Sequence, residues 1–80
     1  MTARVYITLR RDILDPEGKA VGNALRSLGF AEVGEVRVGK YMELQLADGP
    51  GSPEARLKEM CDKLLANPVI ENYRFEIEAR

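Results

Sequence analysis

The chain has 80 residues and a formal net charge of −1, with 12 Lys and Arg, 13 Asp and Glu, no His and one Cys. Without His, the chain cannot build a Ser–His–Asp or Cys–His pair, and a single Cys cannot form a structural zinc site. A net charge near zero is also atypical of nucleic-acid-binding domains, which usually carry a basic surface. We therefore expect one domain over residues 1–80, with no catalytic residue, no cofactor and no metal site of its own.

Length and hydropathy set two further expectations. A chain of this size buries only about 60–65% of its extended surface, so self-association is the available source of additional buried area. Apolar runs extend over no more than three residues, which is too short to span a membrane. The N-terminal residues pass straight into an alternating pattern, without the apolar segment of a signal peptide, and we expect a cytoplasmic protein.

The first two predicted elements are a strand and a helix. Residues 4–10 alternate apolar and polar side chains, as a half-buried strand does. Asp15 followed by Pro16 is typical of a helix start, where the side chain caps the first turn. A single apolar stripe at helical spacing is predicted to pack on a sheet: Ala20, Val21, Ala24, Leu25 and Leu28. Gly29 follows, at the place where a left-handed residue ends many helices.

Residues 32–46 return to the two-residue period of strands. Val36 and Val38 share one face, and a second apolar set shares a face after Gly39–Lys40. This second set comprises Met42, Leu44 and Leu46. Two strands joined by a tight turn at Gly39–Lys40 fit the pattern, and so does one bent strand with a bulge at Gly39.

A loop, a helix and a strand complete the chain. Gly and Pro dominate residues 48–53, and Ser52 can cap a helix that has Pro53 at its first position. The apolar stripe of this helix comprises Leu57, Met60, Cys61, Leu64 and Leu65. Asn67–Pro68 ends the helix. Residues 73–78 alternate again and predict the last strand.

The predicted element order is β-α-β-β-α-β, which is typical of an α+β, ferredoxin-like fold with one antiparallel sheet and both helices on one face. The other face of the sheet would hold polar side chains of both charge signs, together with two tyrosines. Such a mixture fits burial against a partner better than it fits an anion site. We therefore assign self-association to this face, at Tyr6, Arg37, Tyr41 and Glu43.

Two local patterns resemble chemical sites, but their context argues against each. Residues 34–40 approach the phosphate-binding pattern G-x-x-x-x-G-K, yet Tyr41 stands where Ser or Thr is needed, and a strand is predicted to follow. Cys61 lies on an apolar stripe with no His to activate it, so a buried core thiol is the expected state. The residues alone therefore predict an oligomeric α+β module without naming its function.

Four stretches of the chain carry a resemblance to a known family: residues 5–9, 14–20, 36–44 and 60–73. They resemble the PurS family, the small subunit of phosphoribosylformylglycinamidine synthase. The resemblance covers almost the whole chain, and its most specific part is the run C-D-K-L-L-A-N-P-V-I-E that begins at Cys61. Glu17, where the family often has Gln, and the loop at residues 49–53 depart from the family pattern.

The resemblance implies a subunit of a purine-biosynthetic ligase. That enzyme converts formylglycinamide ribonucleotide, ATP and glutamine to formylglycinamidine ribonucleotide, ADP, phosphate and glutamate. In the family, a large synthetase subunit (PurL) uses ATP and Mg²⁺, and a glutaminase subunit (PurQ) releases ammonia. The small subunit has no catalytic residue, forms a dimer that bridges the two and supports ammonia transfer. The implied partners are PurL, PurQ and a second copy, with no nucleic acid and no membrane. We place the partner contacts at strand and helix ends: Asp15, Gly39, Lys40, Asn67 and Asn72.

Three other functions fit the predicted fold. A ligand-sensing domain of the ACT type, the main alternative, would bind a small molecule at a helix–strand seam, often with a glycine in the first loop; residues 10–14 have none. An acylphosphatase-like enzyme needs an anion cradle of loop amides, typically rich in glycine, and the same loop lacks it. An RNA-recognition sheet needs aromatic and basic side chains together. Here three glutamates would lie among the tyrosines: Glu35, Glu43 and Glu76.

Overall fold

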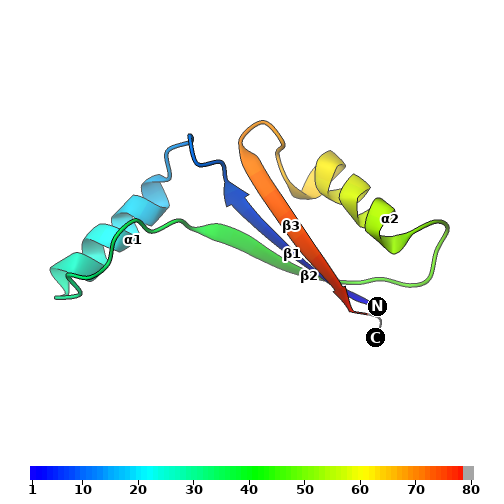
Figure 1. The fold of residues 1–80 in the computed structure, drawn as a ribbon, viewed down its shortest axis with the longest axis horizontal. Helices are drawn as coiled ribbons and strands as arrows, with labels where there is room; N and C mark the ends of the chain where they lie inside the picture. The colour runs from blue at the N-terminus through cyan, green and yellow to red at the C-terminus, as the bar shows by residue number, and fades with distance from the viewer. Residues whose placement is uncertain (79–80) are drawn as a thin grey trace.

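The computed structural model describes residues 1–78. The chain passes from a strand through a helix to a second strand, and then through a helix with a π-helical last turn to a third strand (Figure 1). The elements are β1 (Thr2–Leu9), α1 (Pro16–Ser27), β2 (Gly39–Gln45), α2 (Pro53–Met60), η1 (Cys61–Leu65) and β3 (Glu71–Glu78).

The three strands form one antiparallel sheet in the order β2-β1-β3, so β1 lies in the centre. Val5 of β1 lies opposite Met42 of β2 on one side and opposite Phe75 of β3 on the other. The α+β class, the antiparallel sheet and the two helices predicted from the sequence are confirmed. The fourth strand of the predicted ferredoxin-like sheet is not formed within residues 1–78.

The missing strand is the one predicted to precede a turn at Gly39–Lys40. These two residues belong to β2 and lie opposite Thr8 and Ile7 of β1. A two-residue hairpin of the favoured type needs positive φ at its first position, and Gly39 does not have it. A Cβ at this position would collide with the carbonyl oxygen of Ile7, so the glycine serves the close approach to β1. The alternative arrangement, one bent strand with a bulge at Gly39, is not formed either: β2 begins at Gly39, its register with β1 is unbroken, and residues 33–38 lie outside the sheet.

Two side chains hold the chain before β2 against the loop that leads into α1. The Arg37 guanidinium donates to the carbonyl oxygens of Arg10 at 2.8 Å and Ile13 at 3.1 Å. The Val38 N–H donates to the Asp15 carboxylate at 2.8 Å. These hydrogen bonds direct the chain away from β2, which is the physical reason that the predicted hairpin does not close.

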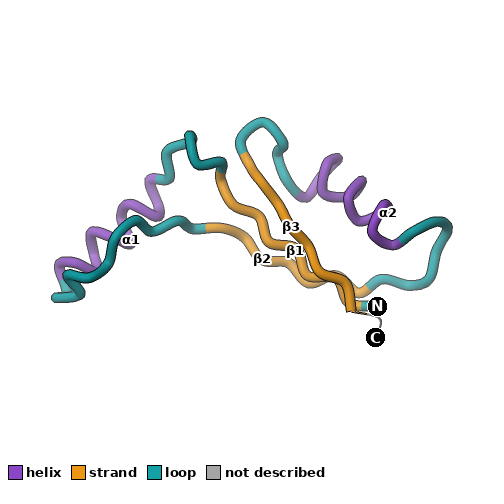
Figure 2. The backbone as a smooth tube through the Cα atoms, in the orientation of Figure 1, coloured by secondary structure: helices purple, strands orange, loops and turns teal. Residues whose placement is uncertain are grey.

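As a result, α1 and the extended segment after it project from one end of the sheet as an arm, defined here as residues 16–38, whereas α2 covers one sheet face (Figures 1 and 2). The molecule measures 51 × 28 × 14 Å, and its Cα radius of gyration is 16.1 Å. A compact chain of this length would have a radius of gyration of about 12 Å. The prediction that both helices cover the sheet is therefore correct for α2 and wrong for α1.

The apolar stripe predicted on α1 does not pack on the sheet. The buried positions of the helix are Gly18 and Gly22, and a Cβ on Gly18 would meet the carbonyl oxygen of Val36. The glycine-containing side of α1 therefore faces the segment after the helix, close to Val36. Within the stripe, Leu25 is half-buried, and four residues are exposed: Ala20, Val21, Ala24 and Leu28.

The core lies between β1 and the helical segment α2–η1. Its fully buried side chains come from alternate residues of β1 and from the stripe of the second helix: Ala3, Val5, Ile7, Leu57 and Cys61. Half-buried apolar residues of the outer strands pack around them: Met42, Leu44, Tyr73, Phe75 and Ile77. This core agrees with the alternation and the helical spacing seen in the sequence.

The helix boundaries also agree with the sequence. Asp15 caps α1 by accepting from the Gly18 N–H at 2.9 Å, and Ser52 caps α2 by accepting from the Ala55 N–H at 3.3 Å. Gly29 has a φ of +102°, the left-handed conformation expected after a helix.

Candidate interaction surfaces

The sheet face opposite α2 carries an aromatic pair. Tyr6 of β1 and Tyr41 of β2 lie opposite each other, with ring centroids 5.1 Å apart. The guanidinium of Arg74, from β3, lies 3.9 Å from the centroid of the Tyr6 ring, and the Tyr6 hydroxyl contacts Glu76 at 3.3 Å. Cross-strand pairs of this kind hold the three strands in register.

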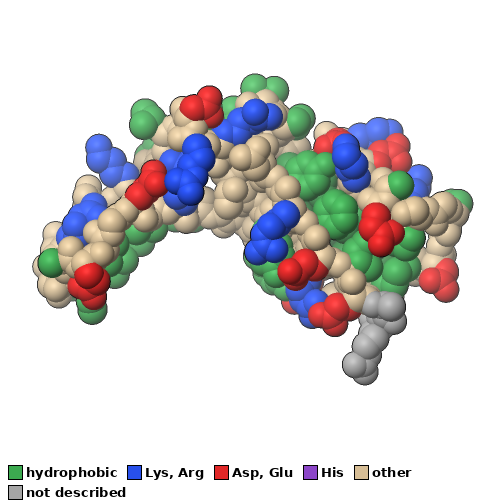
Figure 3. All heavy atoms as spheres, viewed as in Figure 1, with side chains coloured by type: hydrophobic (Ala, Val, Ile, Leu, Met, Phe, Trp, Pro, Cys, Tyr) green, Lys and Arg blue, Asp and Glu red, His purple; other side chains and the backbone are tan. Residues whose placement is uncertain are grey.

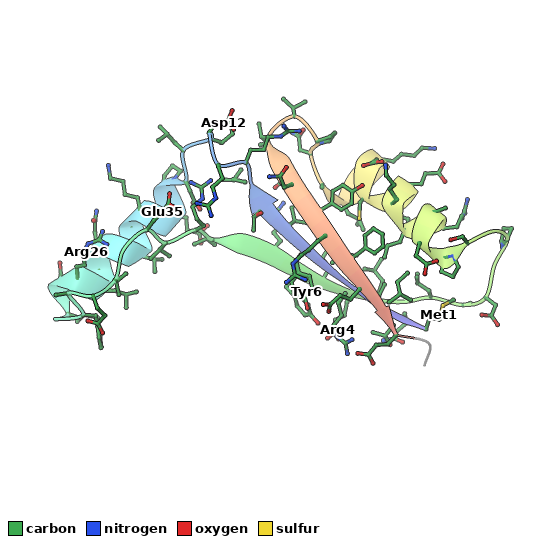
Figure 4. The ribbon with its side chains drawn as sticks, viewed as in Figure 1. Met1, Arg4, Tyr6, Asp12, Arg26 and Glu35 are labelled. Carbon is green, nitrogen blue, oxygen red and sulfur yellow. The ribbon has the colours of Figure 1, made fainter. Side chains whose placement is uncertain are left out.

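Charged side chains on the same face pair with each other. Arg4 forms ion pairs with Glu78 of β3 and, at 3.8 Å, with Glu43 of β2. The Tyr41 hydroxyl donates to Glu43 at 2.6 Å, and this hydrogen bond to a carboxylate raises the pKa of Tyr41. Figure 4 shows Arg4 and Tyr6 side by side on the sheet. Because its acids and bases are already paired, this face does not offer the free basic charge that a phosphate chain requires.

The structure brings together three of the four residues assigned to self-association, Tyr6, Tyr41 and Glu43. Arg37 lies apart from them, beside the loop between β1 and α1, where it bonds to the Arg10 carbonyl oxygen. The strand alternation that placed Arg37 on this face does not apply, because its segment is outside the sheet.

Four of the five residues assigned to partner contacts lie around one end of the sheet, which we call the hinge end. Thr8 of β1 lies opposite Gly39 on one side and Asn72 on the other. Lys40 forms an ion pair with Glu71 at 3.6 Å. The turn that contains Asn67 leads into the same end, and the Asn67 side chain accepts from the Val69 N–H at 3.1 Å.

The fifth residue, Asp15, joins the hinge end through Val38 but is only 9% exposed. Hydrogen bonds from the N–H groups of Gly18 and Val38 lower the pKa of its carboxyl group, and the Arg37 charge acts in the same direction. Both carboxylate oxygens are therefore used inside the chain, so Asp15 shapes the surface without being available to a partner.

Sequence reasoning missed the side chain that stiffens the arm. Arg26, in the last turn of α1, donates to the carbonyl oxygens of Val33 at 3.0 Å and Gly34 at 2.9 Å, and to the Asn23 side chain at 2.8 Å. Figure 4 shows Arg26 on the arm, with Glu35 nearer the sheet. A single exposed arginine carries no sequence signal for this role, because its partners are backbone oxygens.

A cavity of about 310 Å³ lies between α1 and the segment beside it. Its polar lining includes Arg11, Lys19, Arg26 and Glu35, and Arg11 and Glu35 form an ion pair at 3.4 Å. Gly39 and Lys40 begin β2, so a strand follows the phosphate-loop-like pattern as the sequence predicted, whereas residues 34–38 lie outside the sheet. Cys61 is fully buried, and burial raises the pKa of its thiol, as expected for a core residue.

Apolar side chains also remain at the surface. Between β2 and the second helical segment lies a groove of about 510 Å³, which we call the apolar groove; its apolar lining comprises Leu44, Met60, Leu64 and Leu65. Leu64 is 82% exposed. On the arm, Leu28 is 73% and Phe30 is 48% exposed. Figure 3 shows hydrophobic side chains along the lower edge of the arm and beside the sheet.

Metal-binding clusters and membrane-spanning helices are both absent from residues 1–78. No group of three or more His, Cys, Asp or Glu side chains in this part of the chain is arranged to hold a metal ion. The helices formed by these residues are too short and too polar to cross a membrane.

Comparison with known proteins identifies the family. A family model described as PurS, phosphoribosylformylglycinamidine (FGAM) synthase, matches residues 2–79. The phosphoribosylformylglycinamidine synthase subunit PurS of Bacillus subtilis is 51% identical over 75 residues, which cover 94% of this chain and 89% of that protein. The crystal structure of Bacillus subtilis PurS has a TM-score of 0.90 and 49% identity, covering 96% of each chain.

A chain in the structure of PurLQS from Thermotoga maritima has a TM-score of 0.71 and 25% identity, covering 95% of this chain and 96% of that one. The matches extend over the sheet, both helices and the arm. The chain therefore belongs to the PurS family of phosphoribosylformylglycinamidine synthase subunits.

Proposed function

We propose that this chain is a non-catalytic subunit of FGAM synthase that, as a dimer, bridges the glutaminase and synthetase subunits. The similar Thermotoga maritima chain belongs to a PurLQS assembly, which supports PurL and PurQ as the partners. The observation that carries the proposal is the shape: a sheet body and an arm extend over 51 Å, so one small chain presents well-separated surfaces. Such a shape suits a spacer between larger subunits.

In the proposed function, the spacer supports the transfer of ammonia from the glutaminase active site to the synthetase active site. Ammonia released from glutamine becomes ammonium in neutral water, and ammonium is not nucleophilic. A sheltered path between the two active sites keeps ammonia neutral and raises its effective concentration at the second site. In this scheme the synthetase partner binds ATP and Mg²⁺, and the present chain holds the two partners in register.

The hinge end is the proposed contact surface for these partners. Lys40 of β2 and Asn72 of β3 are exposed there, and Asn67 is exposed in the turn that leads into β3. Asp15 supports the same surface from inside through its hydrogen bonds, and Gly39 supports it by allowing close approach of β2 to β1. Partner recognition would therefore depend on the exposed polar side chains at the hinge end, which the strands and the turn before β3 hold in position.

Reconstitution tests this proposal. Purified PurL and PurQ are assayed for ADP formation with glutamine, and separately with a high concentration of ammonium salt, with and without the chain. We expect glutamine-driven turnover to require the chain and ammonium-driven turnover to depend on it much less. An unchanged glutamine-driven rate would overturn the proposal and favour the ACT-type sensor, which calorimetric titration of the chain with amino acids and nucleotides would then reveal.

A matched pair of variants tests the contact surface. Lys40→Glu reverses an exposed charge at the hinge end, and Asp48→Lys reverses one in the loop after β2, at the opposite end of the sheet. We expect Lys40→Glu to raise the concentration of chain needed for half-maximal glutamine-driven activity about tenfold, a loss of the size expected for a contact charge. Equal effects of the two variants would contradict the assignment to the hinge end.

A further inference from the structure

The cavity of about 310 Å³ between α1 and the segment beside it gathers basic side chains from three parts of the chain. Its volume is at the lower end of the range for small-molecule sites, which is about 300–1,000 Å³. Glycines of α1 and of the segment after it also belong to the lining. The basic residues of the lining are Arg11, Lys19, Arg26 and Arg37, and its glycines are Gly18, Gly22 and Gly34.

Two of the guanidinium groups in this lining are fixed by carbonyl oxygens. Arg26 of α1 donates to the carbonyl oxygens of Val33 and Gly34. Arg37 donates to carbonyl oxygens of the loop between β1 and α1. A carbonyl group orients a guanidinium without cancelling its charge, because it is a dipole and carries no net charge of its own. Both groups are therefore held in place as full cations.

Carboxylates neutralise only part of this positive charge. The Glu35 carboxylate is shared between Arg11 at 3.4 Å and Arg37 at 3.7 Å. Within residues 1–78, Lys19 and Arg26 form no ion pair. One carboxylate therefore serves two guanidinium groups, and two further cations of the lining have none.

The other two acids of the lining do not fill this place. Asp15 is buried, and its two oxygens accept from the N–H groups of Gly18 and Val38. Figure 4 shows Asp12 at the outer bend of the loop, with Arg26 farther along the arm. Taken together, four cations and three carboxylates leave the lining with an excess of one positive charge. A bound anion would complete the balance.

We propose that this cavity binds the phosphate group of a small molecule. Guanidinium forks match the spacing of phosphate oxygens, and a fixed fork loses little freedom on binding. Arg26 and Arg37 provide fixed donors, whereas Arg11 and Lys19 are exposed and free to turn toward the anion. Gly18 and Gly22 keep the facing side of α1 free of side chains.

This mode differs from that of a phosphate loop, because side chains and not successive backbone N–H groups would hold the anion. Gly39 and Lys40, which complete the phosphate-loop-like pattern, belong to β2 and do not line the cavity. The ligand would join the loop before α1, α1 itself and the segment after it. Binding should therefore hold the arm more firmly on the loop and raise the melting temperature of the chain. This inference goes beyond the bridging function and does not depend on it.

A titration of the full-length, ¹⁵N-labelled chain followed by NMR tests the site. The probes are ribose 5-phosphate, inorganic phosphate and, as the uncharged control, ribose, all at low ionic strength because salt screens exposed charges. We expect saturable shifts of the Gly18, Gly22 and Gly34 amide signals with the two phosphate probes and none with ribose. Tighter binding of ribose 5-phosphate would identify a phosphate ester as the ligand, and equal affinities would identify the free ion.

Two charge variants should change the affinity in opposite directions. Lys19→Gln removes an exposed cation of the lining and should raise the dissociation constant for ribose 5-phosphate at least about threefold. Glu35→Gln removes the carboxylate that competes with the ligand and should lower the same constant at least about threefold. Tighter binding is a result that mere damage to the fold would not produce. Lys63→Gln, which removes an exposed charge outside the cavity, is the control and should leave the constant unchanged.

The remaining outcomes overturn the site. One is the absence of saturable shifts with both phosphate probes up to about 10 mM, where a site with millimolar affinity would be mostly filled. Another is an equal response to ribose. Weaker binding by Glu35→Gln, or equal effects of Lys19→Gln and Lys63→Gln, would show that the lining charges do not hold the anion. The bridging function, tested by reconstitution, would stand in each case.

Discussion

One oxygen of the Asp15 carboxylate accepts a hydrogen bond from the Val38 N–H at 2.8 Å, although the two residues are 23 positions apart in the chain. The other oxygen accepts from the Gly18 N–H at 2.9 Å and caps α1. A single side chain therefore starts the helix and fixes the direction in which the arm enters β2. Its loss removes a local and a tertiary interaction together.

Asp15→Ala should lower the melting temperature by about 5 °C or more, which is the effect of losing a helix cap in a domain of this size. Asp15→Asn should cost less, because its amide oxygen can still accept from the Gly18 N–H. Thermal unfolding followed by circular dichroism at fixed protein concentration measures both variants. Equal melting temperatures for Asp15→Ala and the unsubstituted chain would contradict the role described for this carboxylate.

The same residue gives a pH dependence with a definite sign. Its hydrogen bonds to Gly18 and Val38 lower the pKa of Asp15 below its ordinary value of 3.8, so folding favours the ionised form. The stability contributed by the charge is complete at pH values well above 3.8 and is lost as the pH falls through the lower pKa of the folded state. The difference in melting temperature between the unsubstituted chain and Asp15→Asn should therefore be largest near neutral pH and shrink toward pH 3. A difference that grows on acidification would show that the sign is wrong.

Gly39→Ala should destabilise the sheet, because the added Cβ would collide with the Ile7 carbonyl oxygen and approach the Thr8 side chain. Relief of such crowding requires a backbone shift and costs about 1–3 kcal/mol. Gly34→Ala is the control: a Cβ there meets no atom within 4 Å, and Gly34 does not have a positive φ. We expect Gly34→Ala to change the free energy of unfolding in urea by less than about 0.5 kcal/mol. Similar values for the two variants would argue against a tight approach between β1 and β2 at Gly39.

Cys61 should react slowly with a thiol reagent in the folded chain. It is fully buried, and burial raises the pKa of its thiol, so both access and the thiolate fraction are reduced. Labelling with a chromogenic disulfide should be at least about 100-fold slower in buffer than in concentrated urea, because it requires transient opening of the core. Leu64→Cys in a Cys61→Ala background provides an exposed thiol for comparison. Fast labelling of native Cys61 would mean that the second helix does not hold its place on the sheet.

Most local features of the fold could be read from the sequence. The alternation of residues 4–10 and 73–78 predicted β1 and β3, and Asp15 and Ser52 predicted where the two helices begin. These features depend on interactions within a few residues, so the pattern of side chains determines them. The resemblance to the PurS family was also confirmed. A resemblance of this kind depends on which residues stand at which positions, and it does not require knowledge of the path of the chain.

The candidate surfaces were predicted less completely. Tyr6, Tyr41 and Glu43 lie together as strand alternation indicated, since their register follows directly from pairing with β1. Arg37 was assigned to the same face on the assumption that its segment joined the sheet, and that assumption failed. The role of Arg26 could not be inferred, because it depends on backbone oxygens brought near by the return of the chain along α1.

The sequence by itself determined β1, β3, both helices with their caps, and the family, but it also predicted a strand before Gly39 that is not formed. Only the tertiary structure decided what the chain does after α1. The pattern of residues 32–46 allowed either two strands joined by a turn or one bent strand with a bulge at Gly39, because both place the same side chains on alternating faces. Neither is formed: hydrogen bonds from Arg37 and Val38 to groups more than 20 positions earlier hold the segment before Gly39 outside the sheet. As a result α1 lies away from its own sheet, and most of the apolar stripe that was predicted to pack on that sheet remains exposed.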